Sequence, residues 1–228
     1  MDHIITLSES PAFRRAYDGA AARTLDGMPL VWLARLRGAR DARRITGHDI
    51  LDSALARHWA TEGRAFVVCA NERIGQAATA YILRGGGTPE AVAFVVPPLG
   101  FEQDAAYGAE LAERIRVHGT TLLIMAIGAP KSEIWVDQQG AAIGAPLVVA
   151  VGGALGVIMG LQPRAPLFMQ RSGLEWLFRF AQDPRRLFRR YFIKSWRFLS
   201  LLGTAYSDRP GNPPVEIRSK PDPFSSKA

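Results

Sequence analysis

Apolar positions along the chain gather in four short runs that are separated by longer amphipathic stretches. The runs, each of strand length and without polar alternation, are residues 64–71, 91–97, 120–128 and 146–153. Helical spacing of apolar residues, or start and stop signals, predicts helices over residues 11–21, 50–60, 72–83, 104–117 and 132–139. Strands without polar alternation are buried on both faces, so the pattern predicts an α/β fold in which helices cover both faces of a mainly parallel sheet.

Two further segments need separate interpretation. Asp26-Gly27 is expected to form a turn between the first helix and a strand that begins with the apolar residues after it. Residues 138–163 carry no charge over 26 positions, which is long enough for a membrane-spanning helix. This run contains six glycines and two prolines, however, and its most apolar part, LVVAV, is only as long as a strand. We therefore expect a buried strand followed by a glycine-rich loop.

The charge of the chain is concentrated in one place. The 228 residues are 48% hydrophobic and 21% charged, which is enough apolar material for a packed domain. The formal charge is +7, and residues 164–206 hold nine basic and only two acidic residues, so the rest of the chain is neutral. A basic segment of this kind suits an anionic partner such as nucleic acid, anionic lipid or a phosphorylated substrate.

The sequence gives no sign of a disulfide, a metal site or a signal peptide. The single cysteine, Cys69, excludes an internal disulfide and a cysteine-rich zinc site, and the four histidines lack metal-ligand spacing, so no metal is expected. The first ten residues lack the basic start and apolar run of a signal peptide, which favours the cytoplasm.

The basic segment, residues 164–206, interleaves arginines with bulky apolar side chains and has three interpretations. It is predicted to form two helices that are split at Asp183-Pro184, with Ser172 and Asp183 as N-caps, and residues 207–228 are expected to form a flexible tail. The helices could pack on the core, grip nucleic acid, or lie on an anionic membrane. So many Phe, Trp and Leu side chains are too apolar for a solvated face, which favours the membrane over nucleic acid.

Three positions could carry chemistry. Asp26 could act as a general base on a sugar hydroxyl at a sheet edge, although an Asp-Gly step is more often a plain turn. Residues 128–133 follow a strand and open a helix, where backbone N–H groups favour phosphate and Lys131 could pair with a diphosphate, although an ordinary turn with a solvated lysine fits as well. The Gly152-Gly153-x-x-Gly156 loop is a weak signal of the same type.

The chain resembles the WecG/TagA/CpsF glycosyltransferases, also called glycosyltransferase family 26, over about residues 2–206. IMAIGAPKSEIWV is similar to the family's V-G-x-G-x-P-K-Q-E-x-W motif, TLDGMP to its A-D-G-x-x motif, and TGHDILDSAL to its T-G-x-D-L segment. The stretch from VAVGGALG to PRRLFRRY is similar to V-G-x-x-F-D-x-x-A-G, R-A-P, G-L-E-W-x-x-R and P-x-R-x-x-R-Y in the same order.

The resemblance implies an inverting, metal-independent enzyme with no cofactor, which moves a sugar from a nucleotide sugar to a polyprenyl-diphosphate-linked acceptor in bacterial exopolysaccharide or cell-envelope synthesis. It implies a Rossmann-like core over residues 1–163, a membrane appendage over residues 164–206, and a peripheral place on the inner face of the cell membrane. The family's base corresponds to Asp26. The residues that correspond to the donor loops are Gly128, Pro130, Lys131, Glu133, Gly152 and Gly153. The arginines that correspond to contacts with the acceptor diphosphate are Arg179, Arg186 and Arg189.

The chain departs from the family pattern at several places. Ser132 stands where the family has Gln, Leu155-Gly156 replaces its Phe-Asp pair, and Cys69-Ala70-Asn71 replaces a glycine-containing loop. The family's T-x-N strand end would fall just before Met1, so we expect the true start to lie upstream. These departures leave open a second function, a membrane-associated member that binds its ligands without turnover. The donor sugar, acceptor sugar, linkage and oligomeric state are not set by the sequence.

Overall fold

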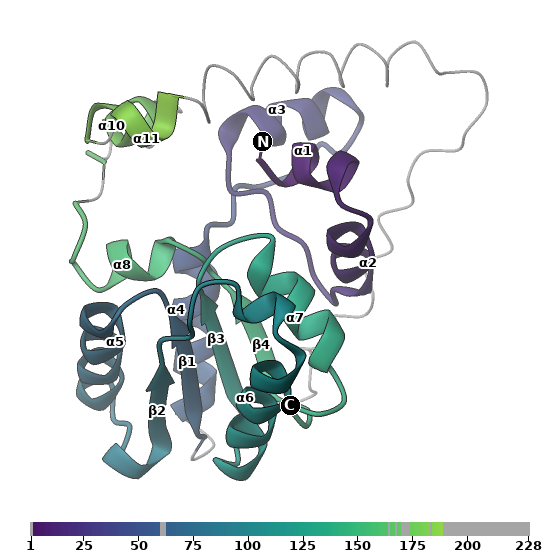
Figure 1. The fold of residues 1–228 in the computed structure, drawn as a ribbon. Helices are drawn as coiled ribbons and strands as arrows, with labels where there is room; N and C mark the ends of the chain where they lie inside the picture. Colours follow the sequence, from purple (N-terminus) through teal and green to yellow (C-terminus); the bar gives the residue numbers. More distant parts are fainter. Residues whose placement is uncertain are drawn as a thin grey trace, which may run out of the picture.

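The computed structural model describes residues 2–59, 63–163, 165–166, 168–169, 174–182 and 184–188. At the centre of this part lies a sheet of four parallel strands with the order β2-β1-β3-β4 (Figure 1). The strands are β1 (Ala65–Cys69), β2 (Val92–Val95), β3 (Leu122–Ala126) and β4 (Leu147–Ala150). All four predicted strands are confirmed, and the fold is α/β and Rossmann-like.

Four helices of the described part precede β1 along the chain, and the first three lie within residues 2–36. These three are α1 (Asp2–Glu9), α2 (Pro11–Gly19) and α3 (Met28–Leu36). Helix α2 begins as predicted, because the Ser10 side chain accepts a hydrogen bond from the Phe13 N–H at 3.2 Å and Pro11 stands at the first helical position. Helix α2 packs against α7 (Lys131–Gln139) and α1 packs against α2.

The strand expected after Asp26-Gly27 is wrong, because residues 28–36 form helix α3. Gly27 is the N-cap and Pro29 lies in the first turn, where a backbone N–H would have no partner within the helix, so the missing N–H of proline costs nothing. The segment that follows is built from Met, Leu, Ala and Arg, which favour helix, and contains Val31 as its only β-branched residue. A short apolar run can form either element, and here the helix start signals decide.

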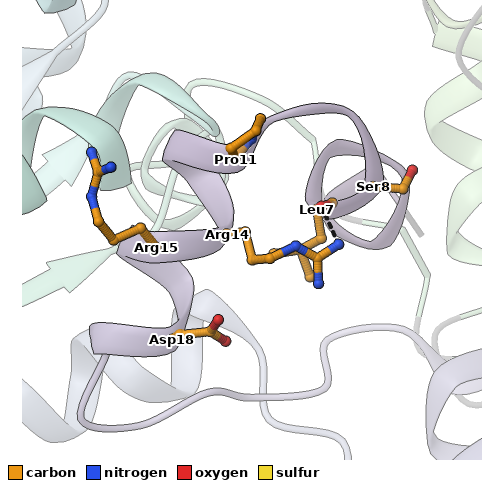
Figure 2. Close-up of a pocket in the computed structure, with 6 residues that line it drawn as sticks. All are labelled: Leu7, Ser8, Pro11, Arg14, Arg15 and Asp18. Carbon is orange, nitrogen blue, oxygen red and sulfur yellow. Dashed lines mark hydrogen bonds between the residues drawn. The ribbon is translucent and has the colours of Figure 1, made fainter.

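A shallow hollow of about 440 Å³ lies between α1 and α2 (Figure 2). Across its mouth the Arg14 guanidinium donates a hydrogen bond from Nη2 to the backbone oxygen of Leu7 at 2.6 Å. None of the residues predicted for the site lines this hollow.

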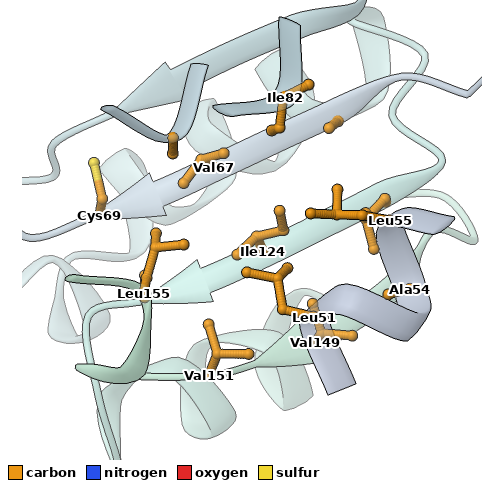
Figure 3. Packing of buried hydrophobic residues seen from close by; sticks show 14 residues of the cluster. Leu51, Ala54, Leu55, Val67, Cys69, Ile82, Ile124, Val149, Val151 and Leu155 are labelled. Carbon is orange, nitrogen blue, oxygen red and sulfur yellow. The ribbon is translucent and has the colours of Figure 1, made fainter. Parts of the chain in front are cut away.

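One face of the sheet is covered by α4 (Gly47–Trp59), α5 (Glu72–Arg84) and α8 (Ala154–Ile158). Their buried side chains Leu51, Ile82 and Leu155 meet the strand residues Val67 and Ile124 in a continuous apolar cluster (Figure 3). Alternate residues of the same strands point to the other face. There Val68 and Met125 pack under Leu111 and Ile115 of α6 (Ala105–Val117) and Trp135 of α7. Burial on both faces explains why the strands have no polar alternation.

Two of the helices that follow strands, α5 and α6, begin at polar N-caps. The Asn71 side chain accepts a hydrogen bond from the Ile74 N–H at 3.0 Å and caps α5, two residues after β1 ends. The Asp104 side chain caps α6 in the same way through the Tyr107 N–H. Two short 3₁₀ helices, η1 (Pro89–Ala91) and η2 (Phe101–Gln103), frame β2. The three helices predicted between strands are all confirmed, with ends that differ by at most one residue.

The uncharged run 138–163 contains β4 and the short helix α8, so the strand interpretation is confirmed and part of the glycine-rich loop is helical. None of the helices in the described ranges is both long and apolar enough to span a bilayer. After the uncharged run lie α10 (Glu175–Gln182) and α11 (Pro184–Phe188), which confirm the predicted pair of helices on either side of residue 183. The proposed caps Ser172 and Asp183 and the predicted tail, residues 207–228, lie outside the described residues.

Candidate active site

The order of the strands places a topological switch point at the carboxyl ends of β1 and β3. These two strands are neighbours, with Cys69 opposite Ala126, and the helices that follow them, α5 and α7, lie on opposite faces of the sheet. The two following loops therefore leave the sheet in opposite directions. In open α/β sheets, ligands bind at such a switch point. The loop after β3 is the one that carries Gly128.

The two predicted glycine loops meet at this edge. Gly128 and Gly152 both have positive φ, at +89° and +52°. A Cβ added to Gly152 would lie 3.5 Å from the Gly128 Cα, so the two backbones touch without side chains between them. The N–H groups of Val151 and Gly152 both donate to the Met125 backbone oxygen, at 3.0 and 3.2 Å, which fixes the second loop on the end of β3. A Cβ on Gly153 would meet no atom within 4 Å, so this position faces open space.

Lys131 has a partner that the sequence did not predict. Its Nζ lies 3.5 Å from Oε1 of Glu102, whose side chain is only 12% exposed. Both residues line a pocket of about 500 Å³ between η2 and the start of α7, together with Pro130 and the buried Trp135. A phosphate that approached Lys131 would therefore compete with this carboxylate.

The two residues after Lys131 are turned inward. Ser132 is 1% exposed, and its hydroxyl donates a hydrogen bond to the Gly128 backbone oxygen at 3.4 Å. Burial raises the pKa of Glu133 above its usual value. In the described part of the chain its Oε2 is buried and finds no hydrogen-bond partner. Ser132 thus supports the loop, while Glu133 offers an unsatisfied oxygen beside it.

Asp26 lies in the loop between α2 and α3, and its side chain is 67% exposed. Arg44 holds this loop, because its Nε donates to the Asp26 backbone oxygen at 2.7 Å and its Nη2 lies 3.7 Å from Oδ1 of the carboxylate. The Ile45 N–H also donates to the Leu25 backbone oxygen at 3.0 Å. Arg44 was missed by the sequence analysis, since nothing in the spacing of Asp26 and Arg44 indicates their contact.

The chain after Arg44 leads directly to the glycine loops. Thr46 and Asp49 form a reciprocal cap at the start of α4: the Thr46 N–H donates to the Asp49 carboxylate at 2.8 Å, and the Asp49 N–H lies 3.3 Å from the Thr46 hydroxyl oxygen. A Cβ on Gly47 would lie 3.1 Å from the Ala154 Cβ and 3.4 Å from the Val151 backbone oxygen. These contacts form a strip that runs from Asp26 through Arg44 and residues 45–47 to Val151 and Ala154, which flank Gly152 and Gly153 in the loop after β4.

The loop after β1 is used for structure. Cys69 is fully buried, and desolvation raises the pKa of its thiol to about 11. The Asn71 side chain is engaged as the cap of α5. This loop lacks a glycine that would let a ligand approach the backbone there.

The arginines predicted for the acceptor lie in the C-terminal part. Arg179 belongs to α10 and Arg186 to α11, whereas Arg189 lies outside the described residues. Over the ranges that the structure describes, no cluster of three or more His, Cys, Asp or Glu side chains is arranged to hold a metal ion.

A comparison with known protein families identifies the family of the chain. The model of the glycosyl transferase WecG/TagA/CpsF family matches residues 1–210, which is nearly the whole chain. The match includes the Asp26 loop, both glycine loops and the helices α10 and α11. The chain therefore belongs to the WecG/TagA/CpsF family of glycosyltransferases, which act in the synthesis of cell-envelope polysaccharides.

Proposed function

We propose that this glycosyltransferase moves a sugar, with inversion, from a nucleotide sugar to a polyprenyl-diphosphate-linked acceptor in exopolysaccharide or cell-envelope synthesis. Asp26 takes the proton of the acceptor hydroxyl, whose oxygen forms a bond to the anomeric carbon. The bond from that carbon to the diphosphate oxygen breaks, and the nucleoside diphosphate leaves with the electron pair. The observation that carries this proposal is the strip of contacts from Asp26 to the loop after β4, where Gly152 meets Gly128.

The donor would rest on the glycine loops. Gly128, Gly152 and Gly153 let a diphosphate approach the backbone closely, since no side chain stands between them. Pro130 and Lys131 would line the same side, with Lys131 exchanging its contact with Glu102 for phosphate oxygens. Glu133 would accept a hydrogen bond from a hydroxyl or N–H of the donor, which gives its unpartnered oxygen a role.

The acceptor side would involve the C-terminal part. Arg179, Arg186 and Arg189 would hold the lipid diphosphate, because guanidinium forks match its oxygens. The enzyme would then work as a peripheral protein on the inner face of the membrane, with the basic segment 164–206 against anionic lipid. No nucleic-acid partner is part of this proposal.

A second candidate is a member that binds without turnover. It is favoured by Ser132, which stands at the family's Gln position yet is buried and bonded to Gly128, so its hydroxyl is committed to the loop. Such a protein would bind a nucleotide sugar with no release of nucleoside diphosphate.

The test is a panel of radiolabelled nucleotide sugars with a polyprenyl-diphosphate-sugar acceptor in detergent. We expect one donor to give a labelled lipid product, and Asp26→Asn to lower its rate about 10²- to 10⁴-fold, because a general base contributes that much. Asp18→Asn, a matched change of an exposed aspartate on α2, should leave the rate unchanged. Near-normal turnover by Asp26→Asn in a folded protein would remove Asp26 from the role of base. Donor binding by calorimetry with no product for any donor would favour the second candidate.

A further inference from the structure

Within the part of the chain that the structure describes, one apolar face of helix α3 is exposed. The helix buries Val31, and the positions opposite Val31 are Pro29, Trp32 and Leu36, which share one side of the helix by their spacing. Trp32 is 48% exposed and Leu36 is 85% exposed, both far more than is usual for such large side chains. Ile45, which follows the loop after the helix, is 42% exposed.

Arginines crowd the end of this helix. Residues 35–44 contain five arginines and one acid, Asp41, a net charge of +4 inside a part of the chain that is neutral as a whole. Arg44 turns to Asp26, while Arg35, Arg37, Arg40 and Arg43 are exposed at the surface. The loop that presents them is ordered by its own bonds, since Arg35 Nε donates to the Ala42 backbone oxygen at 3.0 Å and the Ala39 N–H to the Ala34 backbone oxygen at 3.0 Å.

We propose that this α3 surface is a contact site for an anionic lipid membrane, in addition to the C-terminal basic segment. We define the α3 surface as Pro29, Trp32, Leu36 and Ile45 with the exposed arginines of residues 35–43. A tryptophan and aliphatic side chains with arginines next to them in the chain are typical of a protein face that lies at the level of the lipid headgroups. The charge is complementary to anionic headgroups, and the side chains of Trp32 and Leu36 would enter the boundary of the acyl chains.

The contact would set the depth of the catalytic loop. Asp26 immediately precedes Gly27, the N-cap of α3, so a membrane under α3 brings Asp26 to the headgroup level. The diphosphate and first sugar of a lipid-linked acceptor lie at that same level. This consequence rests on the proposed function, whereas membrane contact by α3 does not require turnover.

The test uses a fluorescent label on the full chain. Leu36→Cys is labelled with a thiol-reactive NBD dye, which brightens and shifts to the blue in an apolar environment, and Val117→Cys at the end of α6 is the control, since Val117 is 72% exposed. The native Cys69 is fully buried and needs no replacement. With vesicles of phosphatidylcholine and phosphatidylglycerol, free of any acceptor, we expect at least a twofold rise in emission at position 36 and no change at position 117. Vesicle binding of the protein with an unchanged signal at position 36 would overturn the proposal.

Charge reversal gives an independent measurement. Arg37→Glu, Arg40→Glu and Arg43→Glu are combined, and the control combines Arg73→Glu, Arg84→Glu and Arg114→Glu on α5 and α6, which are also exposed. Each basic residue at an anionic surface changes partition by about fivefold, so we expect the first set to weaken vesicle binding more than tenfold relative to the control. Equal weakening by both sets would mean a general charge effect and overturn the proposal. A rise of the label signal with protein concentration in the absence of vesicles would assign the surface to a second copy of the chain instead.

Discussion

Glu133 is the side chain in the candidate site whose burial has the clearest consequence for stability. Its pKa lies above the usual 4.5 because burial disfavours the charged carboxylate, so the folded state binds the proton more tightly than the unfolded state. The stability that comes from this group is therefore complete below about pH 4.5 and is lost as the pH rises through the folded pKa.

We accordingly expect Glu133→Gln to stabilise the fold more at pH 8 than at pH 5. Urea unfolding followed by circular dichroism at the two pH values measures the difference. The control is Glu113→Gln, because Arg116 lowers the pKa of Glu113 by a hydrogen bond, and the substitution should bring no gain at pH 8. Equal effects of Glu133→Gln at both pH values would contradict the raised pKa.

Cys69 is predicted to be inert as a nucleophile. Its thiol pKa of about 11 means that almost no thiolate exists at pH 8, and the side chain is fully buried. We expect Ellman's reagent to react with the native protein at least a hundredfold more slowly than with the protein in guanidinium chloride. A fast reaction of the folded protein would show that the end of β1 opens to solvent.

At the scale of elements, the contact between α5 and β2 depends on one glycine. A Cβ on Gly75 would overlap the ring of Phe94 at Cγ, Cδ2 and Cε2, so the whole ring would have to shift. Gly75→Ala should lower the free energy of unfolding, since overpacking costs about 1–3 kcal/mol and the better helix propensity of alanine returns about 1 kcal/mol at most. Gly140→Ala is the control, because the nearest atom to its Cβ is a backbone oxygen at 3.5 Å. Thermal unfolding of the two variants tests this. An unfolding temperature of Gly75→Ala equal to that of the unsubstituted protein would mean that the Phe94 ring moves away without cost.

The strands and most helices could be predicted because their local signals agree with their burial. Residues 65–69 and 122–126 are apolar throughout, and both faces of these strands are covered. Residues 28–36 could not be assigned from apolarity alone, because the face that carries Trp32 and Leu36 is not covered in the described fold. The helix α1 was not predicted, since Ile5 alone is buried among its side chains at residues 3–9 and leaves almost no periodic pattern.

At the scale of the whole molecule, the candidate site is assembled from segments far apart in sequence. The glycine loops could be found from the chain, because each follows a strand directly. The contact of Asp26 with Arg44, and that of Lys131 with Glu102, could not, because they depend on how loops from different elements meet. The distribution of charge along the sequence indicates the basic segment 164–206, but it hides the arginines of residues 35–44, because their net +4 is offset by acids elsewhere.

The meeting of Gly128 and Gly152 has a consequence for how this enzyme could diverge. The two loops meet there through backbone alone, so a ligand bound as proposed would meet atoms that every sequence shares. A point mutation cannot change the chemical groups of a backbone surface. It can only block that surface by adding a side chain. If the donor rests there as proposed, discrimination between one sugar and another has to come from side chains around this backbone contact, and those can change while the backbone keeps its shape.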